Sequence, residues 1–444
     1  MHRIEQPAKK SDAIWKRDIS SSVLTKILLM PIAALVGLMS LRTVTQDYGY
    51  QGLALYGLVI SIPLLLPFAD LGIGGSVTEV VASRATQPYE LLRSTLIRAL
   101  ITLVIAATLI IVIAALLYWA DIWPSLIGVS GAEASTSAMI VMALFGLTVP
   151  FSLGYRILLG LQLNRIVVFM QSISGIVVAV GVILISGTVP LPMIIALPSI
   201  AGLVVSVIAC TLAMMKLSSD GIIGSSTRDD LVPPRLRSLA GPMLIISISV
   251  PIIFQAHRLV LAHLGMTLEL AAYTTAVQLY FPANALLTAA GQSLWPRFSS
   301  LRNTSAESSF ILVLKSMLLF VSAAALIGVF LTILGPHISS WITDDGATAS
   351  RYLFLSFSVL LVINSANYPV AMSMMGQGAV LFQACCSFAS AVASLALMAI
   401  LGSTYGSVGV VAATCIAVLI FSVIPCLYYS WRTSEGIKDE ATNR

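Results

Sequence analysis

The sequence predicts an all-α, polytopic membrane protein with about 12 transmembrane helices in two six-helix bundles related by a parallel repeat. Three observations lead to it: the composition, the continuous apolar runs and the placement of the basic residues. Of 444 residues, 58% are hydrophobic and only 10% are charged, and the mean hydropathy is +0.97. Soluble domains carry roughly 25% charged residues, so this chain has too few to cover a surface in water. The same composition excludes a disordered chain and a disulfide scaffold.

Continuous apolar runs supply the expected helices, because only a helix satisfies its own backbone while crossing about 30 Å of hydrocarbon. Their continuity, without strand-like alternation, disfavours an outer-membrane barrel. We expect spans at Ser22–Leu41, Leu53–Ala69, Leu96–Trp119, Ala138–Leu159, Ile166–Ile185, Pro192–Met215, Leu239–Ala262, Leu270–Leu287, Phe310–Leu334, Tyr352–Met372, Ala379–Leu401 and Val408–Tyr429.

The basic residues indicate the orientation. All but four of the 24 Lys and Arg residues lie in the tails, in alternate connectors or in the ends of the spans next to those connectors, the exceptions being Lys26, Arg42, Arg258 and Arg351. Positive connectors stay cytoplasmic, so both termini are expected in the cytoplasm. The first run has no small-residue cleavage site after it, which is typical of a retained helix. Because the basic residues form no single patch, no nucleic acid partner is expected.

The longest charged connector predicts the domain organisation. We expect an N-terminal tail at 1–21, a bundle at 22–215, a connector at 216–238, a second bundle at 239–430 and a C-terminal tail at 431–444. The two halves share a pattern. Arg42 precedes Gly49 and the run LALY, and Arg258 precedes Gly265 and the run LAAY, with the same seven-residue interval from arginine to glycine. This pattern predicts a parallel repeat of six helices about an axis normal to the membrane.

Catalytic motifs are absent from the sequence. The four histidines are scattered, the cysteines lie in apolar runs without metal-ligand spacing, and there is no phosphate-binding loop, HExxH or GxSxG. We therefore expect a protein that is not an enzyme and holds neither metal nor cofactor. Coupling to Na⁺ or H⁺ stays open.

Three cations within or beside the spans are the candidate binding residues: Lys26, Arg42 and Arg258. Gln255, three residues before Arg258, is expected on the same helical face, and His257 on another. A hydrated chamber with fixed basic groups would bind a phosphate or diphosphate, which arginine grips with two parallel hydrogen bonds. The alternative is that these long side chains reach out to lipid headgroups.

Uncharged polar residues in the predicted helices add a possible sugar-binding lining. Their alternative role is hydrogen bonding between helices. These residues are Gln278, Asn284, Asn364 and Asn367.

Several segments together resemble one known group of transporters. They are RTVTQDYGYQGLALYGLVIS at 42–61, FADLGIGGSVTEVVAS at 68–83, GLQLNR at 160–165 and GSVGVVAA at 406–413. In order and spacing they resemble the polysaccharide flippases of the multidrug/oligosaccharidyl-lipid/polysaccharide exporter superfamily, over essentially the whole chain. One departure is Glu79, where that group is expected to carry a basic residue after the glycine-rich turn.

The resemblance implies a flippase that moves an undecaprenyl-diphosphate-linked oligosaccharide from the inner to the outer leaflet of a bacterial cytoplasmic membrane, for cell-surface polysaccharide synthesis. It implies alternating access, a cationic cavity at Lys26, Arg42 and Arg258, and partners among polysaccharide polymerases and glycosyltransferases. The first alternative is an ion-coupled multidrug exporter of the same superfamily. An exporter of organic cations should carry carboxylates in its spans, and the first, seventh, eighth and tenth expected helices have none. The second alternative, a membrane glycosyltransferase or polymerase, requires larger loops than this chain has.

Overall fold

The protein is helical throughout the part that the structure describes. The computed structural model describes residues 6–66, 73–82, 89–219, 236–292, 294, 298 and 306–442, and no strand occurs among them. The predicted all-α fold class is confirmed. The middle of the expected connector, the ends of both tails and residues 67–72, where the glycine-rich run after the second expected helix begins, lie outside the described residues; the end of that run opens α2.

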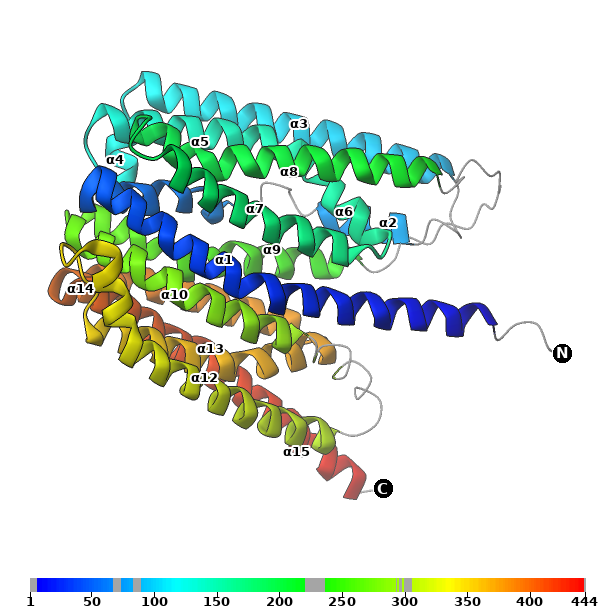
Figure 1. Cartoon of the computed structure of the whole chain (residues 1–444). Coiled ribbons are helices and arrows are strands. Elements are labelled where there is room, and N and C mark those ends of the chain that lie inside the picture. The colour runs from blue at the N-terminus through cyan, green and yellow to red at the C-terminus, as the bar shows by residue number, and fades with distance from the viewer. Residues whose placement is uncertain are drawn as a thin grey trace. The chain divides into compact units, whose positions relative to one another are not determined.

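The helices follow the apolar runs closely (Figure 1). They are α1 (Gln6–Ser61), α2 (Ile73–Ala82), α3 (Tyr89–Trp119), α4 (Trp123–Ile127), α5 (Ala132–Phe151), α6 (Leu153–Gly160), α7 (Asn164–Ile185), α8 (Leu191–Ser219), α9 (Leu236–His263), α10 (Thr267–Gln292), α12 (Ala306–Thr343), α13 (Arg351–Gln377), α14 (Val380–Val418) and α15 (Ile424–Thr442). A 3₁₀ turn, η1 (Pro63–Leu65), follows α1, and a π-helical turn, η3 (Leu419–Val423), joins α14 to α15.

Within the described ranges, nine helical segments are long and apolar enough to cross a membrane. Two of them, Pro31–Leu65 and Val380–Thr433, each overlap two of the expected spans. The expected span at Leu270–Leu287 lies in α10, which carries several polar side chains and is not among the nine. The described residues of the twelve expected spans thus lie mostly on helices, although Leu53–Ala69 runs past the end of α1 into residues 67–69, which are not described. The chain is a multi-pass membrane protein.

Glycines with left-handed backbone mark the joints that the expected spans required. Gly49 (φ 67°) interrupts α1 and Gly406 (φ 59°) interrupts α14, so each long helix is two helices joined at a kink. Gly265 (φ 70°) ends α9. Gly49 and Gly265 follow Arg42 and Arg258 at the same interval, and both have a positive φ, which residues with a β-carbon seldom adopt. The repeated pattern in the sequence therefore has a local structural counterpart.

Contacts group the chain into two compact units. The first comprises 1–44, 68–126 and 130–233, and the second comprises 45–67, 127–129 and 234–444. The part of α1 from Thr45 onward thus groups with the second unit. The expected division at the connector 216–238 stays a prediction.

In the first unit, α5 packs against α3 and α8, and α6 packs against α2 and α8 (Figure 1). Two glycines permit the close approach of α6. A β-carbon at Gly154 would lie 2.3 Å from the backbone nitrogen of Cys210, and one at Gly160 would lie 2.7 Å from the carbonyl oxygen of Thr78. Small residues at helix contacts are common in membrane proteins, where packing drives association.

In the second unit, α14 packs against α9 and α13, and α13 packs against α10 and α12. The start of α10 is tied to the kink of α14. Glu269 accepts hydrogen bonds from the backbone nitrogen of Ser407, at 3.0 Å, and from its hydroxyl. This carboxylate therefore stabilises the left-handed turn at Gly406.

Large apolar side chains cover the outer faces of the helices. In α3 and α12 only 17% of the most apolar stretch is buried within the protein. In water such a surface would aggregate, whereas in a bilayer it is solvated by lipid. The exposed residues include Ile101, Ile105, Leu109 and Ile113 of α3 and Leu318, Leu319, Leu326 and Phe330 of α12.

Replacing Gly406 with Ala tests the kink in α14. The new β-carbon would lie 3.0 Å from the Glu269 carboxylate in a backbone conformation unfavourable for alanine. We expect a loss of about 1–3 kcal/mol in stability, seen as a lower Tm of the purified protein in detergent. Gly202→Ala is the control, because Gly202 lies inside α8 with no atom within 4 Å of its would-be β-carbon. Equal Tm values for the two variants would contradict the strained backbone conformation and the close Glu269 contact assigned to Gly406.

Candidate functional site

The candidate site lies in the second unit, where α9 turns into α10. Two backbone hydrogen bonds build the turn. The nitrogen of Gly265 donates to the carbonyl oxygen of Ala262 (2.9 Å), and the nitrogen of Met266 donates to the carbonyl oxygen of Leu261 (3.1 Å). Gly265 supplies the left-handed residue that such a helix end requires. Because the connection is so short, the last turns of α9 lie beside the first turns of α10. Arg258 and Tyr273 thereby come into contact.

Arg258 is the central cation of the site. Its side chain is only 5% exposed, and its Nε is shielded from solvent and has no hydrogen-bond partner among the described residues. The guanidinium carbon lies 5.8 Å from the centre of the Tyr273 ring, a cation–π contact. Its electrostatic neighbours in the described part of the chain are the hydroxyls of Tyr273 and Tyr56, with no carboxylate among them. Among the described residues, this buried positive charge thus has no counter-ion.

His257, next to Arg258 in the sequence, is buried in a polar network of its own. Its Nε2 lies 2.7 Å from the hydroxyl of Thr414, and its Nδ1 lies 3.1 Å from that of Tyr273 and 3.2 Å from the carbonyl oxygen of Phe254. The Thr414 hydroxyl is in turn 3.2 Å from that of Ser394. These contacts join α9, α10 and α14 through one imidazole ring.

A second network joins α10 to α13. Asn364 donates from Nδ2 to the Tyr280 hydroxyl (2.8 Å), which donates to Oδ1 of Asn284 (3.3 Å). The Tyr368 hydroxyl donates to the same Oδ1 (2.8 Å) and accepts from the Thr288 hydroxyl (2.6 Å). Each hydroxyl and amide is therefore held in one orientation by a partner on the other helix or one turn away.

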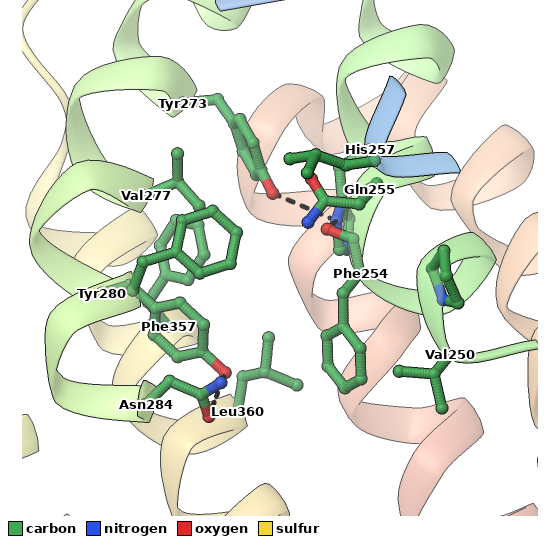
Figure 2. Close-up of a pocket in the computed structure, with 13 residues that line it drawn as sticks. Val250, Phe254, Gln255, His257, Tyr273, Val277, Tyr280, Asn284, Phe357 and Leu360 are labelled. Atoms are coloured by element: carbon green, nitrogen blue, oxygen red, sulfur yellow. Dashed lines mark hydrogen bonds between the residues drawn. The ribbon is translucent and has the colours of Figure 1, made fainter. Parts of the chain in front are cut away.

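Between these networks lies a cavity of about 250 Å³ (Figure 2). Residues of α9 and α10 face each other across it, and the Tyr273 hydroxyl points toward His257 (Figure 2). Aromatic rings form much of its wall, and Tyr273, Phe357 and Tyr280 pack in series with centroids 5.0 to 5.4 Å apart. The lining residues are Leu64, Val250, Pro251, Phe254, Gln255, His257, Tyr273, Val277, Tyr280, Phe281, Asn284, Phe357 and Leu360.

The structure brings some of the expected residues together. Gln255 and Asn284 line the cavity, and Arg258 lies behind Tyr273. Asn364 is buried and reaches the cavity wall only through Tyr280. Their role in binding stays a prediction.

The other expected residues lie elsewhere. Gln278 and Asn367 are half-buried on α10 and α13 and do not line this cavity. Arg42 is half-buried in the first unit. Lys26 falls in α1, but its side chain lies outside the described part of the structure.

Sequence reasoning missed the aromatic wall and His257. The helical-face argument separated His257 from Gln255, yet both side chains line the cavity. One signal was available: Tyr273, Tyr280 and Asn284 recur at intervals of seven and four residues, which places them on one face of a helix. In a chain this apolar, an aromatic stripe is equally typical of helix packing, so the pattern alone did not indicate a cavity.

The described residues also bear on metal binding. They contain no group of three or more His, Cys, Asp or Glu side chains that could hold a metal ion. Binding chemistry at this site therefore comes from a guanidinium, an imidazole, amides, hydroxyls and aromatic rings.

Asn364 and Asn367 provide a test of which amides are structural. Removing the Asn364 side chain leaves the buried Tyr280 hydroxyl without its donor. We expect Asn364→Ala to cost about 1–3 kcal/mol of stability, measured by thermal unfolding in detergent. Asn367→Ala, a control three residues away on the same helix, should cost less than about 0.5 kcal/mol. A larger loss of stability in Asn367→Ala than in Asn364→Ala would contradict the network that joins α10 to α13.

Comparisons with known proteins support the fold. No protein-family model matches the chain, and no curated protein matches it either. An inward-facing multidrug resistance transporter of the MATE family, in the MOP superfamily, has a TM-score of 0.69 at 16% identity, covering 94% of this chain and 99% of its own. The lipid II flippase MurJ, in an inward closed conformation, has a TM-score of 0.65 at 16% identity, covering 92% and 87%. A MATE structure in complex with MaD3S has a TM-score of 0.64 at 15% identity, covering 96% and 97%.

These neighbours are transporters and flippases rather than enzymes. Both the multidrug transporter and the lipid flippase match over nearly the whole chain, so the likeness does not favour one substrate class. At this level of identity it shows the architecture, and the chain has the fold of the polytopic transporters of the MOP superfamily.

Proposed function

We propose that the protein is a flippase for a lipid-linked oligosaccharide diphosphate. It would move an undecaprenyl-diphosphate-linked oligosaccharide from the inner to the outer leaflet of a bacterial cytoplasmic membrane by alternating access, for cell-surface polysaccharide synthesis. Both termini would lie in the cytoplasm, as the placement of the basic residues favours. Polymerases and glycosyltransferases that make and consume the lipid-linked oligosaccharide would be its partners.

The observation that carries the proposal is the buried Arg258 guanidinium, whose Nε has no hydrogen-bond partner and which has no carboxylate beside it among the described residues. A charge in a transmembrane helix costs a few kcal/mol unless it is compensated. Among the described residues the nearest electrostatic partners are two phenols, and neither is an anion at neutral pH. A diphosphate would supply the missing negative charge and accept several guanidinium hydrogen bonds at once.

The cavity offers a place for the sugars next to that cation. Tyrosine and phenylalanine rings provide apolar faces, and the amides of Gln255 and Asn284 provide hydrogen-bonding groups. A pyranose ring carries C–H groups on its faces and hydroxyls around its edge, so it suits a wall of this composition. The similarity in fold to a lipid II flippase agrees with this class of cargo.

The second candidate is an ion-coupled multidrug exporter, favoured by the aromatic, largely apolar cavity and by the similarity to MATE transporters. The acidic residues of the second unit argue against cationic drugs. The helices α9, α13 and α14 contain no Asp or Glu, and the carboxylate at the start of α10, Glu269, is bound to Ser407. A cation entering this cavity would be repelled by Arg258, which lies behind Tyr273, and would find no carboxylate among the described lining residues.

Substitution of Arg258 tests whether the protein is a lipid flippase that binds its cargo through this residue. In proteoliposomes, flipping of a fluorescent short-chain prenyl-diphosphate oligosaccharide should fall about tenfold or more in Arg258→Met, because a charge-assisted hydrogen bond contributes about 1.5–3 kcal/mol. Arg258→Lys, which keeps the charge but loses the planar fork, should be intermediate.

The control is Arg351→Met, which removes the same charge from an exposed position at the start of α13. It should flip the lipid at the wild-type rate. Wild-type rates in both Arg258 variants, at equal reconstitution, would reject Arg258 as the diphosphate ligand. Export of cationic dyes by the wild type, with no flipping of the lipid, would favour the multidrug exporter instead.

A further inference from the structure

We infer that His257 is a proton-binding site linked to the anion site at Arg258, so that an anionic headgroup beside the guanidinium draws a proton onto the imidazole. The inference rests on the proposed function and assigns a role to a buried ring that headgroup binding alone leaves unused. His257 is 1% exposed and lines the cavity next to Gln255.

The partners of the ring can accommodate both of its charge states. A neutral imidazole has one N–H and one acceptor nitrogen, whereas an imidazolium has two N–H donors. The carbonyl of Phe254 faces Nδ1 and can only accept, and the hydroxyl of Thr414 faces Nε2 and can accept. Thr414 can meanwhile direct its own proton to the carbonyl of Val410, 3.3 Å away. An imidazolium would therefore be fully hydrogen-bonded with no heavy atom displaced.

The Tyr273 hydroxyl marks the difference between the two states. When the ring is neutral with its proton on Nε2, this hydroxyl can donate to Nδ1, 3.1 Å away. When the ring is protonated, Nδ1 is a donor and Tyr273 must turn its proton elsewhere, toward the cavity that it also lines. From that tautomer, protonation changes the hydrogen bond that the cavity wall offers to a ligand; from the tautomer with its proton on Nδ1, the ring gains its second proton at Nε2, facing Thr414, and the Tyr273 hydroxyl is already directed elsewhere.

The charges around the ring oppose protonation while the site is empty. On α9 the charged neighbour is Arg258, which repels an imidazolium. The titratable group that faces the ring from α10 is the phenol of Tyr273, and α14 presents the uncharged hydroxyl of Thr414. The phenol of Tyr56, in α1 after the kink at Gly49, faces Arg258. The turn η1 (Pro63–Leu65) has no titratable side chain. None of these described groups is a carboxylate.

An anion at Arg258 reverses that balance. His257 and Arg258 both contact Tyr273: the His257 and Tyr273 ring centres are 5.5 Å apart, and the guanidinium carbon lies 5.8 Å from the same Tyr273 ring. A diphosphate that neutralises the guanidinium weakens its repulsion of an imidazolium and adds an attraction, in a setting of low dielectric. By linkage, the proton must strengthen anion binding as much as the anion strengthens proton binding.

The test measures proton uptake on ligand binding. The full-length protein in nanodiscs is titrated calorimetrically with a short-chain prenyl-diphosphate sugar, whose diester diphosphate does not itself titrate near neutral pH. Repeating the titration in buffers of different ionisation enthalpy gives the number of protons bound. We expect the wild type to take up a fraction of a proton, and its affinity to rise as pH falls, by at most about tenfold per pH unit for one linked proton.

Two variants and one control locate the proton. His257→Gln should bind the probe with no proton uptake and with an affinity that no longer varies with pH. Tyr273→Phe, which removes only a hydroxyl, should keep the uptake and shift the pH at which it occurs. The control is His263→Gln, at the exposed end of the same helix, which should behave as the wild type.

The outcomes separate this inference from the function on which it rests. Binding by the wild type with no proton uptake would overturn the inference and leave the proposed function intact, and this result needs no variant to fold. Proton uptake that persists in His257→Gln would also overturn it. No binding of the probe to the wild type would overturn both the proposed function and the inference.

Discussion

A positive charge buried without a counter-ion is the feature on which the functional account depends. The Arg258 guanidinium has a tyrosine ring beside it and no carboxylate among its described electrostatic neighbours. In a bundle solvated by lipid, such a charge destabilises the protein by several kcal/mol, and simple packing would be served better by leucine or methionine. Its presence is explained if an anion completes the site. The cavity, the imidazole and the aromatic wall then become parts of one binding region within the second unit.

The turn between α9 and α10 is what makes this region possible. Gly265, with its left-handed backbone, lets the chain reverse in a few residues, so that side chains fifteen residues apart in the sequence, Arg258 and Tyr273, come into contact. The carboxylate of Glu269 is committed to the kink at Gly406 and is not available to pair with the guanidinium. The local structure thus explains both the proximity of the groups and the lack of a protein counter-ion.

Much of the fold could be predicted because a bilayer imposes simple rules. Length and hydropathy placed the described part of every expected span largely on helices, and the equal spacing of Arg42–Gly49 and Arg258–Gly265 pointed to two glycines that both have a positive φ. The tight kink at Gly49, with almost no loop between the two helices of α1, could not be predicted, because a glycine before an apolar run is equally typical of a longer loop. Polarity and charge indicated Arg258, Gln255 and Asn284. The aromatic residues and His257 were not predicted to line the site, because their position depends on which neighbouring helix they face, and tertiary packing determines that.

The most direct test of the central claim is an experimental structure of the protein with a bound prenyl-diphosphate oligosaccharide. The account predicts that the phosphate oxygens lie within hydrogen-bonding distance of the Arg258 guanidinium, about 2.7–2.9 Å, with the first sugar against the aromatic wall. It would be contradicted by a headgroup bound away from Arg258, or by an Arg258 side chain paired with a carboxylate of the protein while the lipid is bound.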